Sequence, residues 1–96
     1  MYTHQEITVG RHVIDAFVIP LSRKNFILLK GAQGYCMCGY LNLAAARRFG
    51  DVAVRITGVS TIEEALQAPV AALSPAARAR GIRKGQIVRD ILPYFV

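Results

Sequence analysis

The chain has 96 residues and a formal net charge of +6, and 53% of its residues are hydrophobic while 19% are charged. A chain of this length forms one domain that buries only about 60–65% of its unfolded surface, so a free monomer gains modest stability. No stretch approaches the roughly 18 apolar residues that span a bilayer, and the N-terminus lacks a signal peptide's long apolar region. We therefore expect one cytoplasmic domain over residues 1–96, with no membrane partner and with an apolar surface that favours self-association.

The first third of the chain contains two runs rich in β-branched residues, separated by Gly10 and Arg11. Their apolar members are Ile7, Val9, Val13, Ile14, Phe17, Val18 and Ile19. Two such runs around a short turn predict a β-hairpin, which Pro20 ends.

A second hairpin is expected to follow. The continuous apolar run at 26–29 is typical of a strand buried on both faces, and the turn from Gly31 to Gly34 leads it into a strand over residues 35–40. This turn joins two strands, whereas a phosphate-binding glycine loop leads from a strand into a helix. The two glycines are therefore not a dinucleotide-binding fingerprint.

The first helix is predicted at residues 43–49, with Asn42 as its N-cap and Gly50 just beyond its end. Alternating apolar residues at 52–56 then predict a strand. The segment from Ser60 to Glu63 has the spacing of a capping box, in which Glu63 reaches back to the cap, so a second helix is expected over residues 61–67.

Residues 70–73 are a candidate short strand, and Ser74 followed by Pro75 is typical of an N-cap and the first position of a helix that Gly81 closes. Apolar residues recur at helical spacing over residues 86–92, which predicts a last helix ended by Pro93. The expected fold is α+β, with a small, mixed but mainly antiparallel sheet that begins with two hairpins, and with three or four short helices.

The junction between the predicted strand at 35–40 and the first helix contains both cysteines. Because side chains alternate along a strand, Cys36 and Cys38 should share one face while Tyr35 and Met37 share the other. Two thiols so close on one strand close no useful disulfide loop, so both are expected to be free.

This junction is the candidate ligand-binding site, formed by Cys38, Gly39, Tyr40 and Asn42. Cys38 precedes a glycine and a helix start, where backbone amides and the helix dipole would lower the pKa of a thiol. Gly39 would allow a ligand close approach, and Tyr40 would donate a hydrogen bond. Cys38 is the candidate catalytic nucleophile if the protein is an enzyme.

The competing interpretation is that both cysteines are ordinary buried residues, since cysteine behaves as a small hydrophobic side chain. A catalytic thiol also needs a base, and the two histidines, His4 and His12, lie in the first hairpin. Only a neighbouring subunit would easily bring either histidine to Cys38. Whether the protein is an enzyme therefore stays open.

Metal and cofactor sites are not expected. The two cysteines form a C-x-C pattern rather than the C-x-x-C of a zinc site, and no second pair accompanies them. Glu63 and Glu64 are adjacent on a helix, so their carboxylates face different directions and form no acid–base pair.

Basic residues are concentrated between Arg78 and Arg89. They are Arg78, Arg80, Arg83, Lys84 and Arg89. Such a segment could bind nucleic acid or another polyanion. No nucleic-acid motif accompanies the charge, so a solvated surface is the preferred interpretation and a nucleic-acid partner is not expected.

Several motifs together resemble the YunC-like family of bacterial and archaeal domains, whose function is unassigned. They are Lys30-Gly31, Gly34, Cys38-Gly39-Tyr40-Leu41-Asn42, Gly50-Asp51, Gly58-Val59, Ala79-Arg80-Gly81-Ile82 and Gly85. The resemblance covers nearly the whole chain and implies an N-terminal β region used for tetramerisation. Here that region would be the hairpin within residues 1–22.

The sequence thus predicts an uncharacterised homo-oligomeric domain, a tetramer, with a structural or small-ligand-binding role at the Cys38 junction. Two alternatives remain beside it. One is a cysteine-dependent enzyme or thiol sensor that uses Cys38, and the other is polyanion binding through Arg78 to Arg89.

Overall fold

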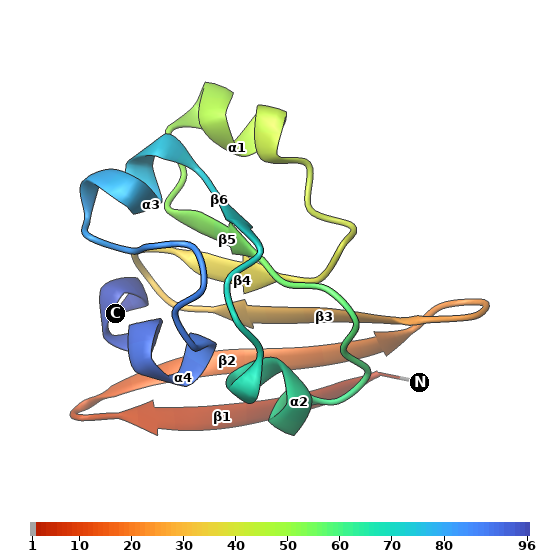
Figure 1. Cartoon of the computed structure of the whole chain (residues 1–96). Helices are drawn as coiled ribbons and strands as arrows, with labels where there is room; N and C mark the ends of the chain where they lie inside the picture. The colour runs from red at the N-terminus through yellow and green to blue at the C-terminus, as the bar shows by residue number, and fades with distance from the viewer. Residues whose placement is uncertain (1) are drawn as a thin grey trace.

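The computed structural model describes residues 2–96, which form one six-stranded sheet packed against short helices (Figure 1). The strands are β1 (Thr3–Val9), β2 (His12–Pro20), β3 (Asn25–Lys30), β4 (Tyr35–Met37), β5 (Ala53–Arg55) and β6 (Ala72–Leu73). They lie in the sheet in sequence order, and neighbours are antiparallel except β4 and β5, which are parallel. Both predicted hairpins are therefore present.

Four α-helices and a final 3-10 turn complete the fold. They are α1 (Leu43–Phe49), α2 (Ile62–Gln67), α3 (Pro75–Ala79), α4 (Val88–Ile91) and η1 (Leu92–Phe95). The predicted α+β class is thereby confirmed. None of the helices in residues 2–96 is long and apolar enough to cross a membrane.

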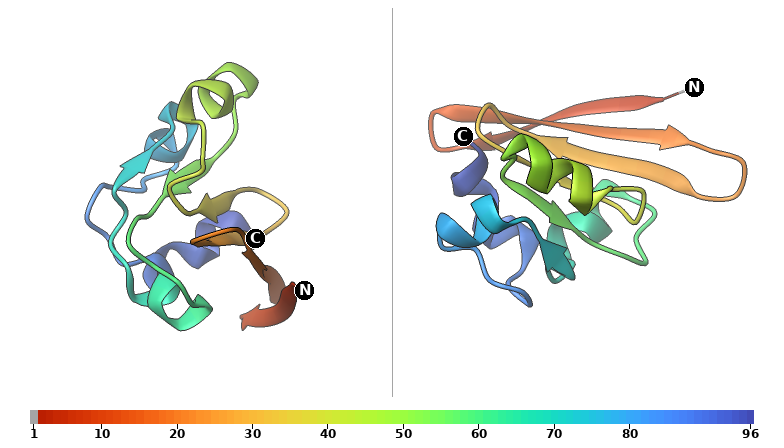
Figure 2. Two further views of the ribbon diagram at one scale, coloured as in Figure 1. Left: turned by 90° about the vertical axis from the view of Figure 1, so that its right-hand side faces the viewer. Right: turned by 90° about the horizontal axis from the view of Figure 1, so that it is seen from above.

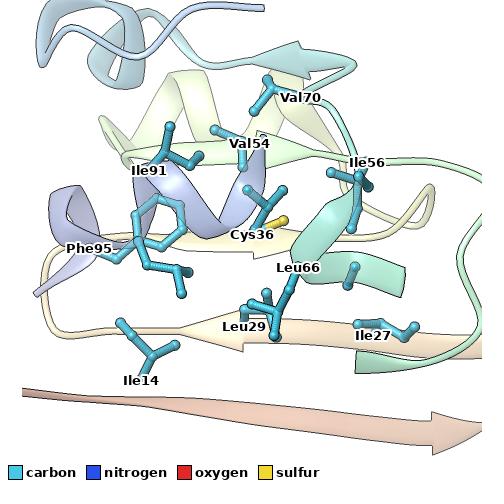
Figure 3. Close-up of a cluster of buried hydrophobic side chains, with 14 of the residues drawn as sticks. Ile14, Ile27, Leu29, Cys36, Val54, Ile56, Leu66, Val70, Ile91 and Phe95 are labelled. Carbon is cyan, nitrogen blue, oxygen red and sulfur yellow. The ribbon is translucent and has the colours of Figure 1, made fainter. Parts of the chain in front are cut away.

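The main core fills the space between one face of the sheet and α2, α4 and η1. Figure 3 shows its side chains, including Ile14, Leu29, Cys36 and Phe95, all with no exposed surface. On the opposite face, α1 contacts β5 and forms a smaller apolar cluster around Ala46. The two faces of β4 therefore meet different clusters, as the alternation of its side chains predicts.

The hairpin of β1 and β2 presents only one of its faces to the core. Ile14 and Ala16 point inward and are fully buried, whereas Val13 and Ile19 point outward and are 47% and 39% exposed. None of the helices in residues 2–96 covers this outer face, which Figure 2 shows as the open side of the long strands.

The turn from Gly31 to Gly34 is closed by the C-terminal segment. The Gln33 amide donates to the Phe95 carbonyl at 2.7 Å, and a Cβ atom on Gly31 would overlap that same carbonyl oxygen. A Cβ on Gly34 would lie 2.7 Å from the Val52 carbonyl oxygen. Both glycines are therefore required by packing, because real Cβ atoms do not come so close to backbone atoms.

The predicted last helix is too long. The α-helix covers only Val88–Ile91, and the chain then continues through Pro93 as a 3-10 turn to Phe95. Proline fits the first turn of that new element because its missing N–H would have no partner there. The docking of Phe95 against Gly31 holds the chain in this path.

The predicted capping box at the second helix is wrong by one residue. Thr61 is the N-cap: its Oγ1 accepts from the Glu64 amide at 3.1 Å, and Glu64 Oε1 accepts from the Thr61 amide at 3.2 Å. Ser60 and Glu63 have the same spacing, but the helix that starts after Thr61 has the buried residue Ile62 at its first position. The predicted N-caps Asn42 and Ser74 are both confirmed.

Candidate functional site

Three loops meet at one end of the sheet, which is the right-hand end in Figure 1. They are residues 22–25 between β2 and β3, residues 38–40 after β4, and residues 57–60 after β5. Because β4 and β5 are parallel, their C-terminal ends lie together, and antiparallel β3 begins beside them. The loops line an open cleft of about 730 Å³, which we call the three-loop cleft.

Cys38 forms part of the floor of this cleft and is only 5% exposed. The predicted strand over residues 35–40 is too long, because β4 ends at Met37 and the Leu41 amide donates to the Cys38 carbonyl at 3.0 Å, which makes a turn. The Cys38 amide still donates to the Ile27 carbonyl, and the Ile27 amide donates to Cys38 Sγ at 3.4 Å. Cys38 is thus held opposite Ile27, at the last hydrogen-bonded pair between β3 and the end of β4.

Cys36 points to the same side of the sheet but does not reach the cleft. It has no exposed surface and lies within the main core. Burial, with a smaller contribution from the neighbouring Cys38, raises the pKa of its thiol to about 12. Cys36 therefore stays protonated at neutral pH and acts as an ordinary core residue, while Cys38 alone faces the cleft.

Gly39 is the one glycine of the eight whose lack of a side chain the fold does not explain. Five glycines have positive φ, namely Gly10, Gly50, Gly58, Gly81 and Gly85, and two are closed in by packing, namely Gly31 and Gly34. Gly39 has no positive φ, and a Cβ atom placed on it would meet nothing within 4 Å. It lines the three-loop cleft, so its bare backbone faces open space there.

Tyr40 lines the cleft beside Gly39 and leaves 54% of its surface exposed. Its ring centroid lies 6.1 Å from that of Phe26 at a tilt of 38°, so one aromatic neighbour supports it. Asn42 is placed differently, since it is outside the cleft lining and its Oδ1 accepts from the Ala45 amide at 3.1 Å. Of the four predicted site residues, the fold thus gathers Cys38, Gly39 and Tyr40.

The sequence prediction missed the basic wall of the cleft. Arg23 and Lys24 lie in the loop between β2 and β3 and line the cavity, whereas no aspartate or glutamate does. Within residues 2–96 the one ion pair joins His4 to Asp15, so no carboxylate neutralises these two cations. Their adjacency in the sequence was the available signal, but only strand pairing brings them opposite Gly39.

The histidines lie elsewhere. His4 stacks on Phe17, with ring centroids 4.7 Å apart, and its Nε2 lies 2.9 Å from Asp15 Oδ1 on the outer face of the hairpin. Neither His4 nor His12 lines the three-loop cleft. In the described part of the chain, no group of three or more histidine, cysteine or acidic side chains could hold a metal ion.

Two of the basic residues between Arg78 and Arg89 line different surface depressions. Arg78 lines a groove between α1 and α3 together with Arg47, and Arg80 lines a separate pocket beside Asp51. The guanidinium of Arg83 donates to the Arg78 carbonyl at 3.3 Å, at the end of α3. Part of this charge is therefore used in capping a helix.

Comparison with known proteins places the chain among domains of unassigned function. A family model described as "Domain of unknown function (DUF1805)" matches residues 37–94. The uncharacterized protein YunC of Bacillus subtilis is 36% identical over 90 residues, which cover 90% of this chain and 89% of that relative. The crystal structure of TA1206, a protein of unknown function from Thermoplasma acidophilum, matches with a TM-score of 0.96 and 34% identity, over 100% of this chain and 94% of that one. The resemblance to YunC is thereby confirmed, and the chain belongs to the DUF1805 family.

Proposed function

We propose that this protein binds a small anion in the three-loop cleft. The observation that carries the proposal is Gly39, whose bare backbone faces open space without a conformational or packing reason. A glycine at such a position allows a ligand to approach the main chain closely. The cleft volume of about 730 Å³ lies in the range of small-molecule sites.

The sign of the ligand's charge follows from the cleft lining. Arg23 and Lys24 are the charged side chains there, and no acid accompanies them. An anion between them would gain charge-assisted hydrogen bonds, which are stronger than neutral ones. A cation would meet uncompensated repulsion.

Titration with inorganic phosphate, followed by NMR amide shifts, tests this proposal. We expect shifts in residues 38–40, and at least tenfold weaker binding by the double variant Arg23→Gln/Lys24→Gln, because hydrogen bonds to charged groups contribute about 1.5–3 kcal/mol each. The double variant Lys84→Gln/Arg89→Gln is the control, since it removes the same charge from exposed positions outside the cleft. Equal weakening in both variants, or no binding by the wild type, would contradict the proposal.

We also propose that the protein is a homotetramer that assembles through its N-terminal hairpin. Two surfaces there support the proposal. One is the uncovered outer face, where Val13 and Ile19 are exposed on either side of the His4–Asp15 ion pair, and the other is the free edge of β1. Two different two-fold interfaces, one by face and one by edge, generate a closed tetramer.

Light scattering after size exclusion tests this assembly. We expect four chains in the wild type and a smaller species in Val13→Glu/Ile19→Glu, because the outer face then carries charge. The control is Phe49→Glu on α1, which changes a side chain that is 73% exposed and outside the hairpin. If the wild type has the mass of one chain at every concentration measured, the tetramer proposal is wrong.

A second candidate function is that of a thiol enzyme or sensor, favoured by the position of Cys38 in the cleft lining. It predicts that iodoacetamide at neutral pH alkylates Cys38 much faster than the buried Cys36. Equal and slow labelling of both would identify two plain core residues. The free thiols also fit a reducing compartment, so we propose a cytoplasmic location.

Polyanion binding through Arg78 to Arg89 is the weaker alternative, because Arg78 and Arg80 line different depressions and the Arg83 guanidinium donates to the Arg78 carbonyl. It predicts retention on a nucleic-acid column that falls steeply with salt.

A further inference from the structure

We propose that the ligand of the three-loop cleft is a phosphate ester with a planar ring, whose ring stacks on Tyr40 while its phosphate lies against Arg23 and Lys24. This inference rests on the proposed anion site and adds the chemical class of the ligand. Its evidence is the aromatic side chain and the size of the cavity, neither of which a simple inorganic anion uses.

Tyr40 is an exposed aromatic side chain in the lining of the three-loop cleft. It leaves 54% of its surface accessible, although aromatic side chains usually bury most of their area. Phe26 supports the ring at a centroid distance of 6.1 Å in a tilted arrangement, which leaves Tyr40 with a free surface. Such a ring stacks planar groups with little preference for their identity.

The cleft is larger than a single inorganic anion bound by Arg23 and Lys24 would fill. A volume of about 730 Å³ holds far more than one tetrahedral anion, so the phosphate site accounts for only one part of the cleft. Around Tyr40 the lining includes the hydroxyl-bearing Ser22, Thr57 and Ser60 and the glycines Gly39 and Gly58. The hydroxyl groups can form hydrogen bonds with the polar edges of a ring that stacks on Tyr40.

The charges favour phosphate over carboxylate. Arg23 and Lys24 supply two positive charges on adjacent residues, and no acid in the cleft offsets them. A phosphate monoester carries close to two negative charges at neutral pH, whereas a carboxylate carries one. The arginine guanidinium also matches phosphate oxygens in a two-pronged geometry.

Two matched pairs of small molecules test this ligand class on the full-length protein. We expect phenyl phosphate to bind about tenfold more tightly than methyl phosphate, and AMP to exceed ribose 5-phosphate by a similar factor, because each pair differs only by the ring. Tyr40→Leu should remove this tenfold advantage, whereas Tyr40→Phe, which keeps an aromatic ring, should retain it. An advantage shown by AMP alone would identify a nucleotide, and an equal advantage for phenyl phosphate would identify a general aryl phosphate.

The outcomes distinguish failure of the ring-stacking inference from failure of the anion site on which it rests. If neither phenyl phosphate nor AMP binds more tightly than its counterpart without the aromatic ring, the ring-stacking inference is overturned while the anion site stands. An unchanged ring advantage in Tyr40→Leu would overturn it as well. If no phosphate compound binds at all, the anion site itself fails.

Discussion

The two ends of β4 carry similar glycine-containing turns, yet one end is closed and the other is open. At the first end, Gly31 and Gly34 are pressed against the Phe95 and Val52 backbones, so that neither position could hold a side chain. At the second end, Gly39 has nothing within 4 Å of the place where a Cβ would be. A strand of three residues thus separates a structural glycine turn from a functional candidate.

This difference teaches that a glycine must be judged by what surrounds it. The residue type is the same at both ends. Only the packing environment distinguishes a glycine that the fold requires from one that leaves room for a ligand. Substitutions at the two ends should therefore have opposite consequences for stability and for binding.

The largest effect on stability is expected from Phe95→Ala, which removes the side chain that closes the first end. Phe95 has no exposed surface, so the loss of burial and the cavity left behind should lower the free energy of unfolding by about 3–5 kcal/mol. Urea denaturation measures the change. Tyr40→Ala is the matched control at the open end, with an expected change below about 0.5 kcal/mol. Similar losses in both variants would mean that the open end is packed as tightly as the closed one.

A smaller effect is expected from Gly31→Ala. The added methyl group would overlap the Phe95 carbonyl and lie 2.7 Å from Ile14 Cδ1, so the free energy of unfolding should fall by about 1–3 kcal/mol. Thermal unfolding of Gly31→Ala and Gly39→Ala, measured side by side, checks the contrast. A tolerated Gly31→Ala would show that the C-terminal segment does not close this turn.

Alkaline pH should lower the free energy of unfolding through Tyr35, at the closed end of β4, and we expect this effect to be smaller than those of the two substitutions above. Partial burial, and then the hydrogen bond from Tyr35 Oη to Asp51 Oδ2, raise the pKa of Tyr35 from 10.0 to about 12. The unfolded chain therefore releases this proton first, so the stability that Tyr35 contributes is complete below pH 10 and is lost as pH rises to 12. The raised pKa of Cys36 acts in the same direction from pH 9.0 upward.

Urea denaturation at pH 8 and pH 11 measures this loss. Tyr35→Phe should lose less stability between the two values than the wild type, because it has no phenol to ionise. Tyr40→Phe keeps Tyr35 and should retain the wild-type dependence. A Tyr35→Phe variant with the full wild-type loss would refute the role of this phenol.

Local signals in the sequence predicted much of the fold. Alternation along the strand placed Cys36 and Cys38 on one face, and the N-caps at Asn42 and Ser74 marked two helix starts, because these features depend on residues close in the chain. The capping box was ambiguous for a physical reason: two overlapping pairs had the same spacing, and only the burial of Ile62 selected Thr61 with Glu64.

The features that the sequence missed depend on distant contacts. The path beyond Pro93 is set by Phe95 docking on Gly31, which no local pattern encodes. In the candidate site, Cys38, Gly39 and Tyr40 are neighbours in the chain, so they were found together. Arg23 and Lys24 join them only because β3 begins where β4 ends.

The decisive measurement is phosphate binding by Gly39→Ala. We expect a free energy of unfolding within about 0.5 kcal/mol of the wild type, since the methyl group meets no protein atom, together with at least tenfold weaker binding of inorganic phosphate. Wild-type affinity for phosphate in a folded Gly39→Ala protein would contradict the claim that the open backbone of Gly39 belongs to a ligand site.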